Sequence, residues 1–341
     1  MSHHLAPLAG LDIERHAGEH APTEPPPKPS IGGTFQLDAA VIRALPIPET
    51  EVTEARKYGM SLWGHTAKVL AQLPSGEPKN YFLKMVSLES AGRLMIEGEF
   101  ASLKAIHTVS PEFVPEPYAW GRCNQDLPET YFLLTEFREV GEQPPDPIKL
   151  TAGLADLHKR SVSPTGKFGF HKQTCHAYLP QMTNLWEESW SVLYQKQLAH
   201  LVKLHDERHA DDALSEFQHV CRLTIEKVIP RLLEPLQSEG RSIKPCLVHG
   251  DLWDENTATD AETGEPFIFD AGSFYAHNEY DIGNWRSARH RLSNRVYVDN
   301  YKKHYPISEP ENEWDDRNLL YSLTFDLGAA LLIPGCNLRQ V

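Results

Sequence analysis

Three polar residues with a distinctive spacing lie in the second half of the chain. Asp251 and Asn256 belong to "CLVHGDLWDEN", and Asp270 ends "FIFD". An Asp, an Asn five residues later and a further Asp about a dozen residues on match the phosphoryl-transfer template. In that pattern Asp251 accepts or orients the proton of a hydroxyl nucleophile, while Asn256 and Asp270 hold a metal ion. Oxygen ligands of this charge suit Mg²⁺, particularly when phosphates complete the coordination shell.

A β-hairpin is predicted to bring the two metal ligands together. Between Asn256 and Asp270, the stretch "DAETGEP" is rich in turn formers and has strand-forming residues on both sides. A hairpin folded about residue 263 sets Asn256 opposite Asp270, with Cβ atoms about 5 Å apart. An ordinary acidic loop is the alternative interpretation of "HGD" alone, but it does not explain the three spacings and the intervening turn.

A buried lysine and a glutamate complete the constellation that a kinase of this type needs. Lys84 is flanked by apolar residues in the predicted strand "YFLKMV", which is an odd place for a charge without a partner. In the helix that follows, Glu99 lies on the apolar stripe with Ile96 and Leu103, whereas Glu97 is rotated away by about 200°. We therefore predict that Glu99 pairs with Lys84 and that Glu97 is a solvated surface acid. The alternative is that Lys84 reaches solvent from an edge strand.

Two further segments are candidates for nucleotide contacts. The stretch "YGMSLWGHTAKV" from 58 to 69 contains Gly59 and Ser61, and a turn of this composition can offer backbone N–H groups to phosphates. An ordinary hairpin turn is the alternative there. Glu136 and Phe137 end the last predicted strand of the first lobe, where an inter-lobe hinge would present backbone groups to adenine. This second assignment depends on the kinase interpretation.

The elements that must position these residues indicate an α+β chain of two lobes. Apolar periodicity predicts strands at 81–86 and 131–137, a helix at 91–107, and long helical segments around 183–209 and 213–236. The chain therefore divides into a Pro-rich leader at 1–35, a strand-rich N-lobe at 36–137 that binds ATP, and a helical C-lobe at 138–341 that carries catalysis and substrate binding.

Composition excludes several other classes of protein. The 341 residues include 33 basic and 47 acidic ones, and this acidic balance argues against nucleic-acid or anionic-membrane partners. Five cysteines without a C-x-x-C pair, and no long apolar run, indicate a reduced, cytoplasmic protein. Neither H-E-x-x-H nor G-x-S-x-G occurs, so a zinc enzyme and a serine hydrolase are not indicated. The oligomeric state is left open.

The other polar residues near the cluster have structural interpretations. His249 is expected to brace the catalytic loop, and Asp281 to cap a helix or brace a loop. His158, on the apolar face of a helix, is expected to be a satisfied core residue. Asp254 and Glu255 are left to solvent.

Several separate motifs, in order, resemble the fructosamine kinase (ketosamine-3-kinase, protein-ribulosamine 3-kinase) family. The resemblance extends from about Glu51 to the C-terminus, and the motifs that carry it are "RLMIEGEFASLKAI", "KFGFHKQTCHAYLPQ", "HGDLWDEN" and "FIFDAGSFYAHNEYDIG". The segments "NLWEESW" and "EYDIGNWR" look most like fungal members. The chain departs from the family in reading Asp270-Ala271 where many members have Asp-Pro, and in a phosphate loop with fewer glycines.

The resemblance implies a two-lobed protein-kinase-like fold of the aminoglycoside-phosphotransferase branch. It also implies ATP- and Mg²⁺-dependent phosphorylation of the 3-hydroxyl of ketosamines, free or on protein lysines, as a step in deglycation. By position, Asp251 would be the base, Asn256 and Asp270 the metal ligands, and Lys84 with Glu99 the phosphate-positioning pair. Residues implied near the sugar are Trp253, Phe274, Tyr275 and His277. The indole of Trp253 suits stacking on a sugar, and packing against the second lobe is its alternative.

Two other functions remain open at this point. A small-molecule hydroxyl kinase of the aminoglycoside or choline kinase type would share the same catalytic triplet. A pseudokinase that binds partners without catalysis is the second alternative, although all five expected polar groups are present in the chain.

Overall fold

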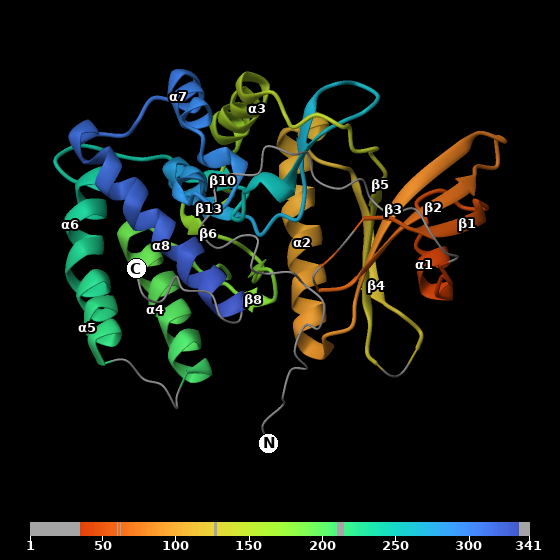
Figure 1. Ribbon diagram of the computed structural model, residues 1–341, viewed down its shortest axis with the longest axis horizontal. Helices are drawn as coiled ribbons and strands as arrows, with labels where there is room; N and C mark the ends of the chain where they lie inside the picture. Colours follow the sequence, from red (N-terminus) through yellow and green to blue (C-terminus); the bar gives the residue numbers. More distant parts are fainter. Residues whose placement is uncertain (1–34, 60, 62, 126–127, 210–214, 334–341) are drawn as a thin grey trace.

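The computed structural model describes residues 35–59, 61, 63–125, 128–209 and 215–333. The predicted leader at 1–35 lies, apart from Phe35, outside the described residues. Figure 1 shows a strand-rich lobe and a larger helical lobe side by side, with helix α2 (Glu89–Val109) standing between them.

The first lobe is built on an antiparallel sheet of five strands in the order β1-β2-β3-β5-β4. The strands are β1 (Glu51–Lys57), β2 (His65–Gln72), β3 (Pro78–Val86), β4 (Pro117–Arg122) and β5 (Tyr131–Glu136). Side chains alternate along β3, so that Tyr81 and Leu83 pack with short helix α1 (Ala39–Arg43) on one face. Val86 packs on the other face against α2, and Lys84, two residues earlier, shares that face.

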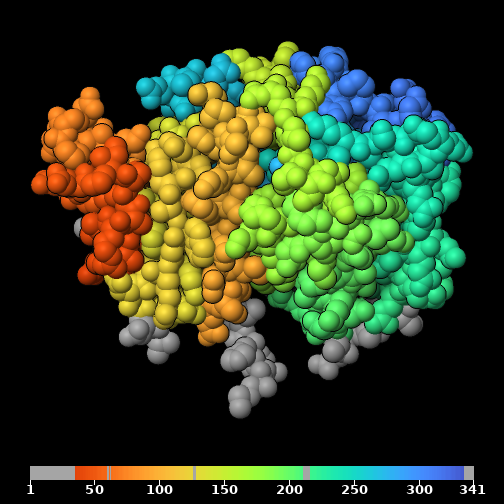
Figure 2. Space-filling model, turned by 180° about the vertical axis from the view of Figure 1, so that it is seen from behind, coloured from red at the N-terminus to blue at the C-terminus, as the bar shows by residue number. Residues whose placement is uncertain are grey.

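Helix α2 has the apolar stripe that the sequence predicts. Ile96, Leu103 and Ile106 are at most 2% exposed, and Phe100 is partly buried at the edge of the same cluster. Glu99 lies on this buried stripe at 8% exposure. In Figure 2 the helix (orange) separates the yellow strands of the first lobe from the green beginning of the second.

The second lobe is mainly helical. Its α-helices are α3 (Pro147–Arg160), α4 (Trp190–Arg208), α5 (Ser215–Leu223), α6 (Ile229–Leu233), α7 (Arg295–His304) and α8 (Trp314–Leu332). Asp146 caps α3 by accepting from the backbone N–H groups of Ile148 and Lys149, and Pro147 occupies the first turn. A π-helical turn (η4, Thr224–Val228) joins α5 to α6. The helix expected from 183 starts later, because residues 186–187 form a short strand.

Short 3-10 helices connect many of these elements. They are η2 (Pro111–Phe113), η5 (Glu234–Gln237), η6 (Asp254–Asn256), η7 (Asn278–Arg286), η8 (Arg291–Ser293) and η9 (Glu311–Glu313). Two of them matter for the site, because η6 follows Asp251 and η7 contains Asp281.

Short strands return where the chain carries its polar cluster. A four-stranded sheet has the order β10-β13-β6-β9, and two hairpins, β7-β8 and β11-β12, lie beside it. The strands are β6 (Phe168–Gly169), β7 (Cys175–His176), β8 (Leu179–Pro180), β9 (Trp186–Glu187), β10 (Cys246–Val248), β11 (Thr257–Thr259), β12 (Pro266–Ile268) and β13 (Phe274–Ala276).

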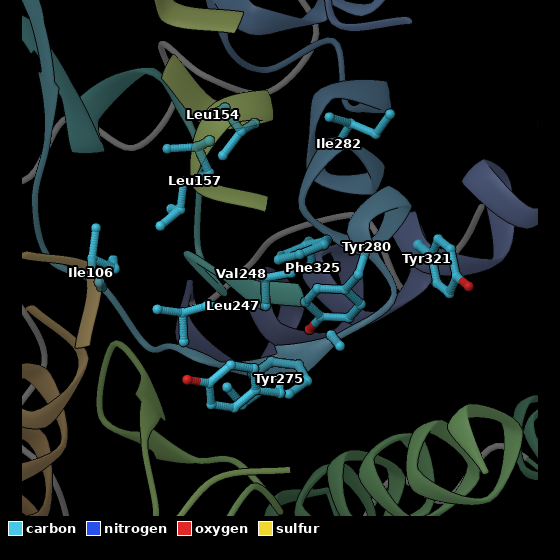
Figure 3. Close-up of a cluster of buried hydrophobic side chains, with 14 of the residues drawn as sticks. Ile106, Leu154, Leu157, Leu247, Val248, Tyr275, Tyr280, Ile282, Tyr321 and Phe325 are labelled. Atoms are coloured by element: carbon cyan, nitrogen blue, oxygen red, sulfur yellow. The ribbon is translucent and has the colours of Figure 1, made fainter. Parts of the chain in front are cut away.

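The core of the helical lobe lies directly behind this sheet. Figure 3 shows side chains from α3, β10, η7 and α8 converging on one cluster, with Leu154, Leu157, Leu247, Val248, Tyr280 and Phe325 among them. Burial of these groups holds the end of β10 in place, and Asp251 follows that strand after only two residues. Among the described residues, no helix is long and apolar enough to cross a membrane.

The connection between the lobes is paired with the β11-β12 hairpin. Val140 and Asp260 form an isolated antiparallel bridge. The N–H of Gly141 donates to Thr259 O at 2.7 Å, and the N–H of Ala261 donates to Glu139 O at 2.9 Å. The segment that follows β5 therefore contacts the far end of the hairpin that separates Asn256 from Asp270.

Candidate active site

Lys84 joins the two lobes through two carboxylates. Its ammonium donates to Glu99 Oε2 at 2.8 Å and to Asp270 Oδ1 at 3.1 Å. Because β3 lies between β2 and β5, and Lys84 is only 6% exposed, the edge-strand alternative is wrong. The contact predicted between Lys84 and Glu99 is present.

Glu97, two residues before Glu99 on α2, behaves differently from it. Its carboxylate pairs with Lys172 and with Arg93, and its side chain is 21% exposed. The expectation of a purely solvated acid was therefore incomplete, since Glu97 links α2 to the segment before β7. Because positions 97 and 99 differ by about 200° around the helix axis, Glu97 forms an ion pair at the surface whereas Glu99 forms a buried one.

The three charged groups Lys84, Glu99 and Asp270 shift one another's pKa. Burial opposes the charge on Lys84, but the charges of Asp270 and Glu99 outweigh it and raise its pKa. Burial raises the pKa of Glu99, and the nearby Asp270 adds to this while Lys84 opposes it. Burial also opposes ionisation of Asp270, but Lys84 outweighs this and lowers its pKa. Asp270 is therefore the carboxylate of this pair that ionises first.

The predicted hairpin forms, but its register differs by one residue from the prediction. Thr257 pairs with Ile268, and the N–H of Phe269 donates to Asn256 O at 3.1 Å. Asn256 is thus opposite Phe269 and not Asp270. Asp270 has φ +57°, a left-handed conformation that Asp tolerates better than most residues and that ends the extended run. This turn of the backbone brings its carboxylate to Lys84.

Asp281 and His249 hold the loop that carries Asp251. Asp281 Oδ2 accepts from the N–H of His249 at 2.7 Å, and Oδ1 accepts from the N–H of Gly250 at 2.9 Å. His249 Nε2 lies 2.9 Å from Phe269 O, while Nδ1 accepts from the N–H of Asp251 at 3.2 Å. Because a backbone N–H can only donate, Nε2 carries the ring proton and donates to Phe269 O. The bracing roles expected for both residues are confirmed.

The same loop approaches the loop after Asp270 very closely. A Cβ at Gly250, which has φ +87°, would lie 2.2 Å from Gly272 O. Only glycine fits both the conformation and the space. The candidate base and the candidate metal ligand are therefore held on two loops in direct contact.

Asn256 has a side-chain oxygen that could bind a cation. Its Nδ2 donates to Asp251 O at 2.8 Å. Among the described residues no donor contacts its Oδ1, and the side chain of Asp270 is 44% exposed. The Oδ1 atom of Asn256 and the carboxylate of Asp270 are oxygen ligands of the kind that Mg²⁺ prefers. Within the same residues, no group of three or more His, Cys, Asp or Glu could hold a metal.

Asp254 is a correction, because it is not left to solvent. Its Oδ2 accepts from the N–H of Arg291 at 3.0 Å, which ties η6 to η8. Glu255 is exposed, as expected. His158 is a satisfied core residue, with Nδ1 2.7 Å from Tyr301 Oη and Nε2 3.2 Å from Asp281 Oδ2.

The structure does not bring all four implied sugar contacts together. Trp253 is partly exposed beside Asp251, and its ring meets that of His290 edge-on at 6.5 Å.

Phe274 and His277 are 0% exposed, so the expectation that they contact a sugar is wrong. The ring of Phe274 stacks on that of Trp190, and the ring nitrogens of His277 form hydrogen bonds with Tyr321 Oη and Ser308 Oγ inside the lobe. Tyr275 is 8% exposed and packs near Trp186 and Phe170. Phe274 and Tyr275 lie on β13, which is buried on both faces, and His277 directly follows this strand; the motif alone did not reveal this burial.

The candidate nucleotide contacts are only partly placed. Gly59 has φ +74°, consistent with a tight turn, and Ser61 Oγ accepts from the N–H of Trp63 at 3.4 Å. At the hinge, the N–H of Glu136 donates to Glu116 O and its carbonyl accepts from Thr135 Oγ1. Both backbone groups of Glu136 are therefore already engaged. Phe137 is half-buried, with its ring 4.0 Å below the ammonium of Lys68.

One contact of the site has no counterpart in the sequence analysis. His176 Nε2, on β7, lies 3.2 Å from Asp251 Oδ1. The motif containing His176 supported the family resemblance, but nothing in its spacing pointed to Asp251. Only the three-dimensional arrangement of the β7-β8 hairpin reveals this neighbour.

The fold is shared with solved structures of kinase-like phosphotransferases. The chain superposes on an aminoglycoside phosphotransferase structure in complex with AMP-PNP and hygromycin B with a TM-score of 0.53 and 12% identity, covering 87% of this chain and 91% of that one. A Thermobifida fusca structure assigned as a fructosamine-3-kinase gives a TM-score of 0.66 and 21% identity, covering 89% and 96%. Both likenesses concern the fold alone.

The family follows from the sequence comparison. The fructosamine kinase family model matches residues 51–340, and the chain belongs to this family. A protein-ribulosamine 3-kinase of Oryza sativa subsp. indica, named as chloroplastic, is 31% identical over 274 residues, which cover 79% of this chain and 75% of the relative. The resemblance inferred from the motifs is confirmed.

Proposed function

We propose that this protein is an ATP-dependent kinase that phosphorylates the 3-hydroxyl of ketosamines, the ribulosamine and fructosamine adducts of lysine amines. The observation that carries the proposal is the ion-paired set Lys84, Glu99 and Asp270 next to the braced loop of Asp251. The name of the rice relative specifies a ribulosamine kinase, which supports this substrate class. Phosphorylation would begin removal of the sugar from the amine.

In the proposed reaction the substrate oxygen attacks the γ-phosphorus of ATP. The new O–P bond forms as the bond from that phosphorus to the β,γ-bridging oxygen breaks, and ADP leaves with its electron pair. Asp251 accepts the hydroxyl proton, while Lys84, held by Glu99, binds phosphate oxygens. Asn256 and Asp270 would hold Mg²⁺, which neutralises phosphate charge when bound.

Further residues of the proposal would contact the nucleotide and the sugar. Gly59 and Ser61 would offer backbone groups to the phosphates, and Phe137 would present backbone groups to adenine, whereas Glu136 supports the hinge. Trp253 would contact the sugar of a free or protein-bound ketosamine. A cytoplasmic location is part of the proposal, because the described cysteines Cys123, Cys175, Cys221 and Cys246 are all free thiols. No feature of the described residues favours another alcohol substrate or a pseudokinase.

An ATP-coupled assay with ribulose-lysine and fructose-lysine tests the proposal. We expect turnover of at least one, and a loss of about 10²-fold or more in kcat for Asp251→Asn with an unchanged melting temperature. Glu255→Gln, an exposed acid in the same loop, is the matched control and should retain wild-type turnover. Equal activity of Asp251→Asn and Glu255→Gln would exclude Asp251 as the base. Turnover of an aminoglycoside or choline, but of neither ketosamine, would exclude the substrate class.

A further inference from the structure

The β7-β8 hairpin places one histidine directly against the candidate base. His176 Nε2 lies 3.2 Å from Asp251 Oδ1, and the two side chains are 16% and 13% exposed. The contact is thus largely shielded from solvent. A hydrogen bond between a ring nitrogen and a carboxylate is stronger and more directional in such surroundings than in water.

The backbone of the β7-β8 hairpin turns sharply next to His176. Cys175 pairs with Pro180 and His176 with Leu179, so that Ala177 and Tyr178 form a two-residue turn. Ala177 has φ +51°, a left-handed conformation that costs a non-glycine residue about 1 kcal/mol or more. Surrounding contacts must therefore maintain this turn.

Those contacts connect the hairpin to the loop after Asp270. Thr174 Oγ1 donates to Gly272 O at 3.2 Å, and Gln181 Nε2 donates to the same oxygen at 3.3 Å. A Cβ at Gly272 would lie 2.4 Å from Cys175 O. Both ends of the hairpin are therefore attached to the loop after Asp270.

Helix α8 closes the other side of the imidazole ring. The ring of Phe325 lies 6.1 Å from that of His176, centroid to centroid. A Cβ at Gly328 would come within 2.6 Å of His176 Nδ1 and 2.8 Å of Cε1. The ring occupies a slot between α8 and Asp251 that exists only because residue 328 is glycine.

We propose that His176 is a positioning residue for Asp251: its Nε2–H holds carboxylate oxygen Oδ1 and so orients Oδ2 toward the substrate hydroxyl. This inference rests on the proposed function, because it assigns to His176 the orientation of the proposed base. A carboxylate with one oxygen restrained loses rotational freedom, and misplacement of a reacting group by about 1 Å can lower a rate by about 10²-fold.

The test compares variants that keep or remove the donor. We expect His176→Phe, which retains a planar ring without N–H, to lower kcat about tenfold or more with the KM for ATP within about twofold. His176→Gln, whose amide can donate, should recover most of this loss. In the Asp251→Asn background, His176→Phe should have no further effect, because the two residues act as one unit. Circular dichroism and melting temperature control for folding.

Each outcome decides a different claim. If Asp251→Asn is inactive but His176→Phe keeps wild-type kcat, the positioning role is overturned and the proposed function stands. If Asp251→Asn remains active, the base assignment fails and the role of His176 fails with it. Equal losses for His176→Phe and His176→Gln would indicate packing in place of donation. If His176→Phe does not fold, Gly328→Ala provides the test: it keeps the imidazole but displaces it, and unchanged kcat in that variant would overturn the proposal.

Discussion

Lys84→Met should destabilise the fold far more than an ordinary lysine substitution. The ammonium lies 2.8 Å from Glu99 and 3.1 Å from Asp270, and is buried. Methionine matches the length of the side chain but leaves two carboxylates facing each other without a cation. The cost therefore comes from uncompensated charge and not from lost packing volume.

The expected loss of free energy of unfolding follows from these two distances. At an effective dielectric constant of about 20, the two attractions are worth roughly 6 and 5 kcal/mol before the cost of burying the charges is subtracted. Removing one partner of a buried ion pair typically costs about 3–5 kcal/mol. Because the side chain of Asp270 is 44% exposed and solvent screens its share, we expect a loss near 3 kcal/mol.

Urea unfolding followed by tryptophan fluorescence measures this loss. Lys172→Met is the matched control, since Lys172 pairs with Glu97 of the same helix α2 but at the surface, and it should cost about 1 kcal/mol or less. The double variant Lys84→Met/Glu99→Gln should recover more than half of the lost free energy. Equal, small effects of Lys84→Met and Lys172→Met would refute the reasoning, as would a double variant no more stable than the single one.

Two more predictions concern the helical lobe. Burial lowers the pKa of His277 to about 4, whereas an unfolded histidine titrates near 6.5. The unfolded chain therefore binds the extra proton first, and stability should fall by about 3 kcal/mol from this residue as pH drops from 6.5 to 4. His277→Gln should lose correspondingly less free energy of unfolding between pH 7 and pH 4, and an identical pH dependence in both proteins would contradict this. Trp253→Leu should raise the KM for the ketosamine several-fold with the KM for ATP unchanged; equal changes in both would indicate that Trp253 only packs against the lobe.

The sequence predicts best what depends on local periodicity. Lys84 and Glu99 could be paired because strand alternation and helical rotation place each side chain on a known face. The hairpin was predicted from its turn residues, but its register was not, because Asp270 adopts a left-handed conformation that no pattern encodes. His277 was misplaced for another reason: a motif shared with a family shows that a residue matters, not whether it contacts a ligand or the core. The His176–Asp251 contact depends entirely on tertiary packing.

The pairing of the inter-lobe segment with the β11-β12 hairpin couples the orientation of the two lobes to the position of the candidate metal ligands. Gly141 and Ala261 make backbone hydrogen bonds across this junction. We therefore expect a rotation of the sheet lobe about the segment after β5 to displace the far end of the hairpin, whose other end carries Asn256 and Asp270. The hairpin thus connects the inter-lobe segment, at one end, to the two candidate metal ligands, at the other. Amide hydrogen exchange at Gly141 and Ala261, with and without Mg-ATP, would report directly on that movement.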